Sequence, residues 1–379
     1  MSVTRAERGA ARAETWTLDR PDGQLAFDVR VRTGKPVDVR GLKGADPEAD
    51  AESHAGVRAA AARLYGTGAA MERLATCPAC TGPIDADDVV MRVHDTPYAQ
   101  CEACGHVAVA WRVSAAIHEA LYRESTAHAT PYISTEAVES RIRAVAEPKL
   151  GWVRDVFEHA VGRRCERVLD VGAGGGHFVA ACRRAGLTAS GIEIGADVRR
   201  FADEALSIDL HDVHYDRPGA TRVLADPDAI TMWGLLDYVG DPAPFLRAAH
   251  RDLVDRSGLV VVEVPRFDCM STAVQSVWND GVMRHQEPTS QVNCFTDASI
   301  ATLLVRTGFR PVAAWYFGLD MYELFSQQAR HGGGPNAWAS GLEVMAETQA
   351  ACDAALMCEG MIVAAVADAA LVDGAAGGQ

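Results

Sequence analysis

The sequence predicts an α/β protein, and three observations support this prediction. From about residue 168 onward, apolar runs alternate with amphipathic helical patterns, as in a parallel sheet covered by helices. A glycine-rich run, Gly172–Gly176, follows the first of these apolar runs and opens a helical pattern. Upstream lie two Cys-x-x-Cys pairs. Before them is a short stretch in which apolar and polar residues alternate. We therefore expect a Rossmann-like sheet preceded by a four-cysteine module and a small β unit.

Composition and charge narrow the class of protein. The chain has 379 residues, 48% of them hydrophobic, which allows two or three domains. Its net charge of −15, without a basic patch, argues against a nucleic-acid partner. No apolar run is long enough to span a membrane, and no apolar segment follows the N-terminal arginines as in a secretory signal. We expect a cytoplasmic protein whose ten cysteines serve as thiols and metal ligands.

The N-terminal region, residues 1–54, reads as a small β unit and a linker. Trp16 and Leu18 alternate with polar residues, turn residues follow at 20–23, and the apolar residues at 25–31 alternate strictly. This pattern predicts a β-hairpin. It carries no chemical motif, so we expect it to serve packing or dimerisation, and the oligomeric state stays open.

The next region, residues 55–125, combines an Ala-rich helix over about 55–73 with the cysteine pairs. Twenty residues separate the two Cys-x-x-Cys pairs, a spacing that fits one tetrahedral zinc ion. The ligands would be Cys77, Cys80, Cys101 and Cys104. Four thiolates leave no open coordination position, so the metal would be structural, and it would stabilise a module too small to hold itself together by apolar burial. The alternatives are chance pairs or a redox-active Cys-x-x-Cys.

The rest of the chain is organised around Val168–Phe178, which reads VLDVGAGGGHF. This is a buried strand, a glycine turn and a helix start. A dinucleotide fingerprint would need a further glycine where His177 stands, and Asp170 before the glycines would repel a pyrophosphate but suit an ammonium group. Glu193 lies 23 residues after Asp170 and closes a second strand, where its carboxylate can accept both hydroxyls of a ribose. An NAD-dependent enzyme remains a weaker alternative.

At these residues the chain resembles the class I S-adenosylmethionine (SAM) methyltransferases. The resemblance implies that Asp170 and the glycine loop hold the methionine part of SAM and that Glu193 holds its ribose. Together with the position of residues at strand carboxyl ends, it predicts a SAM site made of Asp170, Gly172, Ala173, Gly174, Glu193, Ile194, Trp233 and Gly234.

Strands and helices continue to alternate, so we expect the methyltransferase domain to occupy residues 126–370, with a tail at 371–379. A helix begins near Glu147, with Pro148 in its first turn, and another begins after Thr296 as N-cap. The remaining expected elements are strands at 188–193, 207–210, 228–233, 258–265 and 361–366, an aromatic strand starting at 315, and helices at 244–253 and 335–356.

A narrower resemblance is to methyltransferases that carry an N-terminal zinc ribbon, including bacterial deoxysugar C-methyltransferases and relatives in natural-product and polysaccharide pathways. It rests on the two Cys-x-x-Cys pairs, Tyr132 in P-Y-I-S, VLDVGAGGG, Glu193 and the C-F-T at 294–296. The chain departs from those sugar enzymes in two ways. Ser290 and Gln291 stand where they have a Glu-His pair, and we expect no room for their further C-terminal domain. The resemblance implies methyl transfer to a small-molecule or carrier-bound acceptor, and leaves carbon, oxygen and nitrogen open.

The long segment 266–295 supplies the candidate base, because long connections in compact domains are usually functional. His285 is our first choice to accept the acceptor's proton, with Glu287 two residues on. Tyr132 would close over SAM or hydrogen-bond the acceptor. The alternatives are an exposed loop histidine, a solvated Glu287 and a core tyrosine. A different function also stays open, a non-catalytic scaffold of the same fold that binds a partner protein.

Overall fold

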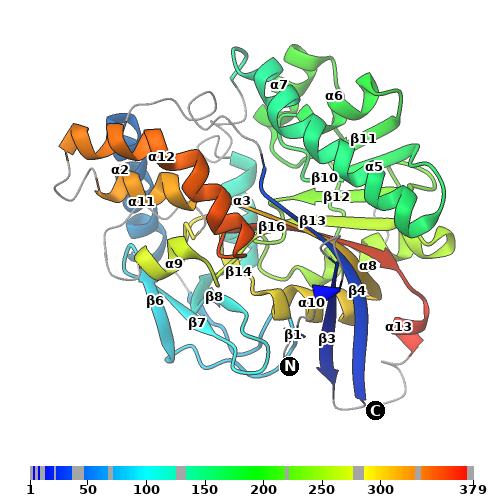
Figure 1. The fold of residues 1–379 in the computed structure, drawn as a ribbon, viewed down its shortest axis with the longest axis horizontal. Helices are drawn as coiled ribbons and strands as arrows, with labels where there is room; N and C mark the ends of the chain where they lie inside the picture. Colours follow the sequence, from blue (N-terminus) through cyan, green and yellow to red (C-terminus); the bar gives the residue numbers. More distant parts are fainter. Residues whose placement is uncertain are drawn as a thin grey trace.

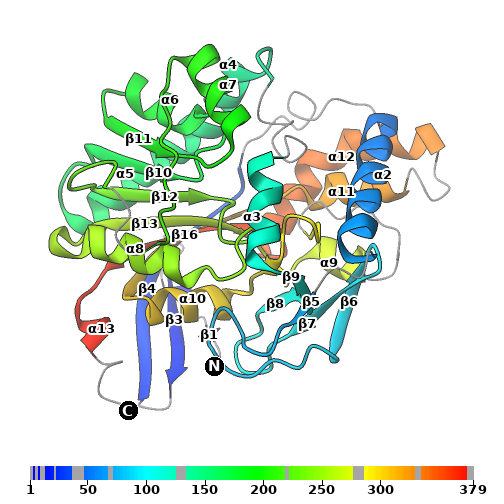
Figure 2. The same ribbon diagram turned by 180° about the vertical axis from the view of Figure 1, so that it is seen from behind.

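The computed structural model describes residues 3–4, 7–8, 13–20, 23–35, 47–66, 71–124, 134–217, 222–275, 286–328 and 334–373. A ten-stranded sheet runs through the molecule (Figures 1 and 2). Its strand order is β1-β3-β4-β15-β16-β13-β12-β10-β11, with β2 paired to β3. Its strands are β1 (Val3–Thr4), β2 (Glu7–Arg8), β3 (Ala13–Arg20), β4 (Gly23–Thr33), β10 (Arg167–Val171), β11 (Thr188–Ile192), β12 (Ala229–Trp233), β13 (Leu259–Pro265), β15 (Phe309–Phe317) and β16 (Gly360–Ala367).

The predicted α/β class is confirmed by the arrangement of this sheet. Strands β11, β10, β12 and β13 are parallel, and β16 is antiparallel to both β13 and β15. Helices cover both faces. One face packs against α5 (Glu147–Val161), α6 (His177–Arg184) and α7 (Ala196–Leu206), and the other against α8 (Ala243–Leu253) and α10 (Asp297–Arg306). Because β10, β11, β12, β13 and β15 all run the same way, their carboxyl ends meet at one edge, where ligands bind in such folds.

The predicted hairpin is present as β3 and β4, and it extends this same sheet. Strand β4 runs parallel to β15, with Arg30 opposite Ala313. Trp16 and Val29 are fully buried on its inner face, while Asp28 is exposed on the outer face. Since β4 is parallel to β15, the carboxyl end of the hairpin also reaches the edge where ligands bind.

The cysteine module forms two smaller sheets beside the large one. The four-stranded sheet has the order β14-β8-β7-β6, and β5 pairs with β9. These strands are β5 (Met71–Arg73), β6 (Val89–Val93), β7 (Thr96–Gln100), β8 (Val107–Val109), β9 (Trp111–Val113) and β14 (Asn293–Cys294). Strand β14 comes from the C-terminal half of the chain, so one strand of the module's sheet is supplied from about 185 residues away in sequence.

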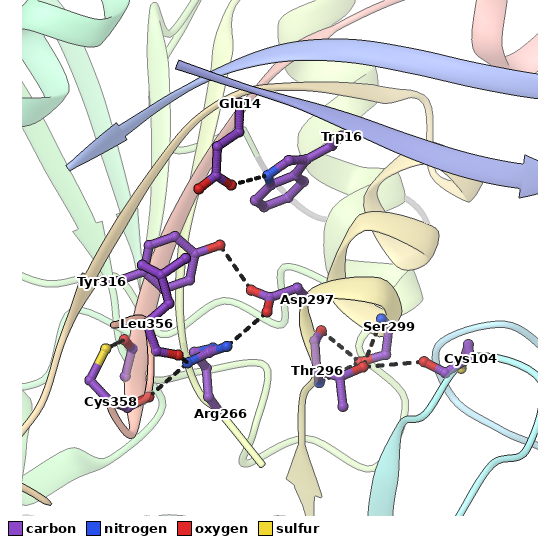
Figure 3. Close-up of polar contacts among 11 residues, drawn as sticks. Glu14, Trp16, Cys104, Arg266, Thr296, Asp297, Ser299, Tyr316, Leu356 and Cys358 are labelled. Atoms are coloured by element: carbon purple, nitrogen blue, oxygen red, sulfur yellow. Dashed lines mark hydrogen bonds and ion pairs between the residues drawn. The ribbon is translucent and has the colours of Figure 1, made fainter. Parts of the chain in front are cut away.

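Side chains also join the module to the large sheet. The guanidinium of Arg306 on α10 donates to the carbonyls of Pro78 and Ala79 at 2.9 and 3.0 Å. The Thr296 hydroxyl donates to the Cys104 carbonyl at 3.2 Å and also accepts from Ser299 N, so the N-cap of α10 contacts a cysteine knuckle (Figure 3).

Figure 3 also shows a buried arginine that ties three segments of the core together. Arg266, directly after β13, is 3% exposed and forms an ion pair with Asp297 at 2.8 Å. Its guanidinium donates to the carbonyls of Leu356 and Cys358, and Asp297 accepts a further hydrogen bond from the Tyr316 hydroxyl. This network fixes how β13, α10 and β16 meet at the carboxyl edge.

Several expected elements are corrected by the structure. The Ala-rich helix is α2 (Pro47–Gly66), and residues 71–73 form β5 instead of its end. The expected strand at 207–210 is reduced to a single bridge between Ile192 and His211. The aromatic residues at 315–317 end β15 instead of starting it.

The helices of the structure beyond those already named complete the fold. Helix α11 was not expected, and the segment 266–295 contains the short helix α9. The remaining helices are α3 (Ala115–Glu124), α4 (Val138–Arg141), α9 (Met270–Gln275), α11 (Asp320–Gln328), α12 (Gly334–Ala354) and α13 (Ala370–Asp373), with a π-helical segment at Ile142–Ala146 and a 3-10 turn at Val254–Arg256. In the described part of the chain, no helix combines the length and apolar character needed to cross a membrane.

Candidate active site and metal centre

The glycine loop after β10 is fixed by backbone hydrogen bonds and close packing. Gly172 N and Ala173 N both donate to the Ile192 carbonyl at 2.9 Å, which binds the loop to the end of β11. Gly172 has φ +75°, and a Cβ there would lie 3.1 Å from the Leu235 side chain. Both the left-handed backbone and this close approach require glycine. The loop therefore lies directly against the segment that follows β12.

The side chain of Glu193 is hydrogen-bonded to the backbone of this loop. Its Oε2 accepts from Gly174 N at 3.0 Å and its Oε1 accepts from Gly195 N at 2.8 Å. Burial raises the pKa of Glu193, while these backbone donors oppose that shift. These two hydrogen bonds hold the carboxylate in one orientation. Each of its oxygens can still accept a further hydrogen bond, as from the two hydroxyls of a diol. Ile194, which follows it, is partly exposed.

Asp170 lies within β10, one residue before its end, and is 1% exposed. Its Oδ1 accepts a hydrogen bond from the Thr231 hydroxyl of β12 at 2.7 Å. Burial raises its pKa to about 7, although the Thr231 hydrogen bond and the charge of Lys149 act in the opposite direction. A cationic group beside Asp170 would stabilise the ionised form.

A charged pair and two aromatic rings lie at the same carboxyl edge of the sheet. Lys149, in the first turn of α5, forms an ion pair with Glu263 on β13 and lies 4.5 Å from the ring centre of Trp233. Trp233 packs edge-on against Phe178 at 4.9 Å. Gly234 follows with φ +62°, which turns the chain away from β12. Of the two residues predicted here from the sequence, Trp233 thus packs on the helix that follows the glycine loop, and Gly234 precedes Leu235, whose side chain packs on Gly172.

The hairpin contributes a second lysine close to this pair. Lys35, just past β4, has its Nζ 4.7 Å from the ring centre of Phe317. Burial and the neighbouring charge of Lys149 together lower its pKa to about 7, although the charge of Glu263 acts in the opposite direction.

The structure adds two residues that sequence analysis missed. Asp237, four residues past β12, is 2% exposed, and its Oδ1 has no hydrogen-bond partner. Asn293 is fully buried, and its amide donates to the carbonyls of Leu236 and Val239 at 3.1 and 2.7 Å. The position of Asp237 just beyond a strand carboxyl end was a signal available in the sequence. Asn293 gave none, because its partners are far away along the chain.

Glu287 is the one candidate catalytic residue whose surroundings can be described. It is partly buried, which corrects the alternative of a solvated loop charge, and it accepts hydrogen bonds from the hydroxyls of Thr289 and Ser290. Burial raises its pKa, and the Ser290 hydrogen bond opposes that shift. Tyr132 and His285 lie outside the described residues, so their catalytic roles stay predictions.

Three tyrosine hydroxyls hold the segment around Glu287. Tyr65 of α2 donates to the Pro288 carbonyl at 2.5 Å, Tyr98 of β7 to Gln291 at 3.1 Å, and Tyr122 of α3 to Ser290 at 3.2 Å. All three belong to the N-terminal part of the chain. The cysteine module and its flanking helices therefore set the position of this segment.

The four predicted zinc ligands come together. The Sγ atoms of Cys77 and Cys104 are 3.6 Å apart, as are those of Cys80 and Cys101, and all four lie within 4.8 Å of one another. A tetrahedral zinc ion with bonds of about 2.3 Å places its thiolates about 3.8 Å apart. The donor set and its spacing thus fit a zinc ion.

Comparison with known proteins agrees with this geometry. The methyltransferase domain family matches residues 132–314. The chain is similar to a ubiquinone biosynthesis O-methyltransferase of Paracidovorax citrulli, with 35% identity over 132 residues, covering 32% of this chain and 53% of that protein. A ubiquinone biosynthesis O-methyltransferase of Pseudomonas aeruginosa is 27% identical over 117 residues, covering 30% and 48%.

Solved structures resemble the chain more weakly. Magnesium protoporphyrin IX methyltransferase from Synechocystis PCC 6803, with bound SAH, is 12% identical, with a TM-score of 0.43 over 67% of this chain and all of that one. The chain spans about half the length of the curated relatives it matches. Residues 132–314, which match the methyltransferase domain family, contain the glycine loop and both carboxylates, Asp170 and Glu193.

Proposed function

We propose that the chain is a SAM-dependent methyltransferase acting on a small-molecule or carrier-bound acceptor. The observation that carries this proposal is the fixed position of Glu193, held by Gly174 N of the glycine loop and by Gly195 N. A carboxylate oriented in this way at a strand carboxyl end suits a ribose diol. SAM supplies an activated methyl group on a sulfonium, and the protein aligns the acceptor with it.

The other residues of the proposed SAM site take distinct roles. Asp170 faces the ammonium end, where a positive charge favours its ionised form. Gly172, Ala173 and Gly174 let the backbone approach the ligand, and Ile194, Trp233 and Gly234 border it. His285 remains our candidate for the proton acceptor, with Tyr132 and Glu287 beside the acceptor.

We also propose one structural zinc ion on Cys77, Cys80, Cys101 and Cys104. The support is the mutual spacing of the four Sγ atoms, together with the burial of Cys77, Cys101 and Cys104. Such an ion would fix the two cysteine knuckles, and its binding free energy would stabilise the module.

The proposed setting of the reaction rests on the net charge of the chain and on its resemblance to methyltransferases that carry a four-cysteine module. A net charge of −15 disfavours a nucleic-acid acceptor. The four-cysteine module next to a methyltransferase domain supports a role in natural-product or polysaccharide metabolism, in the cytoplasm.

Isothermal titration with SAM tests the proposed function. We expect the wild-type chain to bind SAM and Glu193→Ala to lose measurable binding, because a charge-assisted hydrogen bond contributes about 1.5–3 kcal/mol. Glu204→Ala, an exposed glutamate on α7, is the matched control and should bind as the wild type does. The proposal fails if the wild type binds no SAM, or if Glu193→Ala stays within about threefold of it.

A further inference from the structure

Asp237 stands out among the carboxyl groups at the ligand-binding edge. Asp170 accepts from Thr231, Glu193 from two backbone amides, Glu263 is paired with Lys149, and Glu287 accepts from two hydroxyls. Of these described groups, Asp237 alone is at least nine-tenths buried with a carboxyl oxygen that has no hydrogen-bond partner. A buried polar atom without a partner is costly and calls for a functional explanation.

The backbone around Asp237 is held firmly while its side chain is left unpaired. Asn293 N donates to the Asp237 carbonyl at 3.1 Å, and the Asn293 amide bonds the carbonyls on both sides of it. The Asn293 Oδ1 accepts in turn from Arg112 at 2.8 Å and from His106 at 3.2 Å. The cysteine module thus fixes the loop that carries Asp237, which is the pre-organisation a catalytic group needs.

The location of Asp237 places it beside the proposed methyl donor. It follows β12 by four residues, and Leu235 of the same loop packs on Gly172 of the glycine loop. Its neighbour in sequence is Tyr238, whose ring centre lies 5.6 Å from that of Tyr122 of α3, and the charge of Asp237 acts on Tyr122. Asp237 is therefore close both to the glycine loop of the proposed SAM site and to a pair of aromatic rings, which are suited to pack on a flat acceptor.

Resting on the proposed function, we propose that Asp237, in place of the sequence-based candidate His285, contacts the acceptor and accepts the proton that an acidic hydroxyl group of the acceptor releases during methyl transfer. The O–H bond of the acceptor breaks, and its proton bonds to a carboxylate oxygen of Asp237. The oxygen's electron pair forms the new bond to the methyl carbon, while the pair of the carbon–sulfur bond stays on sulfur. The charges of the carboxylate and the sulfonium are both neutralised, so the step balances.

The chemistry of Asp237 favours a phenolic or enolic hydroxyl. Burial, with a smaller contribution from the charge of Glu263, raises its pKa to about 8. A phenol, with an ordinary pKa of about 10, can give its proton to such a group at little cost, whereas an alcohol is far less acidic. The charge of Glu263, the partner of Lys149, acts on Asp237. The charges of Asp237, Glu287, Tyr238 and Tyr65 act on the neighbouring Tyr122.

The experiment uses 4-nitrocatechol, an acidic phenol whose ionisation is visible in its absorbance, titrated into the full chain saturated with S-adenosylhomocysteine. We expect the wild type to bind it and Asp237→Asn to bind it at least about tenfold more weakly. In the wild type, the pH at which the bound phenol ionises should differ from that in Asp237→Asn, because the phenol and the Asp237 carboxyl share one proton. Asp241→Asn is the matched control, because Asp241 is exposed and its side chain accepts a hydrogen bond from Ala243 N at the start of α8, which Asn accepts equally well.

The outcomes separate this inference from the proposed function. SAM affinity should be equal in all three proteins, and its absence from the wild type would contradict the proposed function instead. If the wild type does not bind 4-nitrocatechol, or if Asp237→Asn binds it within about threefold of the wild type, the role of Asp237 is wrong. Circular dichroism checks folding. Asp237→Asn should melt no lower than the wild type, because it removes a buried carboxyl that has an unpaired oxygen.

Discussion

At the scale of single residues, the burial of Asp170 raises its pKa, and this makes both stability and ligand binding depend on pH. Its folded-state pKa of about 7 lies above its ordinary value of 3.8, so the folded protein favours the protonated form. The contribution of this group to the free energy of unfolding therefore falls as pH rises from about 4 to about 7. An ammonium group beside it would reverse this preference, and binding would then release a proton.

We therefore expect SAM affinity to rise with pH between about 5.5 and 7, by up to about tenfold per unit, and to level off above. Titration calorimetry in two buffers of different ionisation enthalpy would show the released proton directly. Asp170→Asn should flatten the slope, leaving a smaller part from Glu193, whose pKa is also raised. Asp237→Asn should keep the slope. A wild-type affinity independent of pH would contradict an ammonium beside Asp170.

The residues of the site differ in how far the sequence reveals them. Asp170, Gly172 and Glu193 lie in a local pattern of strand, turn and strand, so their chemistry can be predicted from neighbouring letters. Asn293 and Asp237 act through contacts between segments more than 50 residues apart. No local periodicity encodes such contacts, and only the fold reveals them.

At the scale of elements, strongly periodic segments were predicted well and segments of ambiguous composition were not. The strands β10, β12 and β13 and the helix α5 follow from apolar runs and from a proline in the first helical turn. Helix α2 begins at Pro47, within a stretch of Gly, Asp and Pro that reads as a loop. Proline is well tolerated in the first turn of a helix, so the turn composition was misleading there.

The hairpin β3–β4 gives a prediction at this scale. Trp16 is fully buried beneath the hairpin, in the same core as α10, so Trp16→Ala should lower the free energy of unfolding by about 3–5 kcal/mol. Asp28→Ala, on the exposed face of β4, should change it by less than about 1 kcal/mol. Urea unfolding measures both. Equal effects from the two substitutions would mean that the hairpin does not pack on the core as described.

At the scale of the whole molecule, the cysteine module and the domain that follows it are joined by a shared strand and by side-chain hydrogen bonds. Strand β14 belongs to the module's sheet, Thr296 bonds Cys104, and Arg306 bonds the first knuckle. The sequence predicted both parts but not their interlocking, because a two-residue strand such as β14 is too short to show a period.

Removing the proposed zinc should therefore loosen a defined part of the catalytic domain. After treatment with 1,10-phenanthroline, we expect faster amide hydrogen exchange at residues 286–296 and 236–239, which the module holds, and little change at 168–176. The non-chelating isomer 1,7-phenanthroline is the control. Exchange that rises only within residues 71–113, or rises equally everywhere, would contradict this coupling.

The parallel pairing of β4 with β15 has a consequence for how the chain is made. The partner of β4 emerges from the ribosome about 280 residues later, which at 5–20 residues per second is about 14–56 s. During that interval the hairpin leaves the exit tunnel with one edge unpaired and with Trp16, Leu18 and Phe27 facing no core. In newly synthesised chains there is therefore a period in which β3 and β4 of one chain can pair with the same strands of another, and this period ends when β15 is made and pairs with β4.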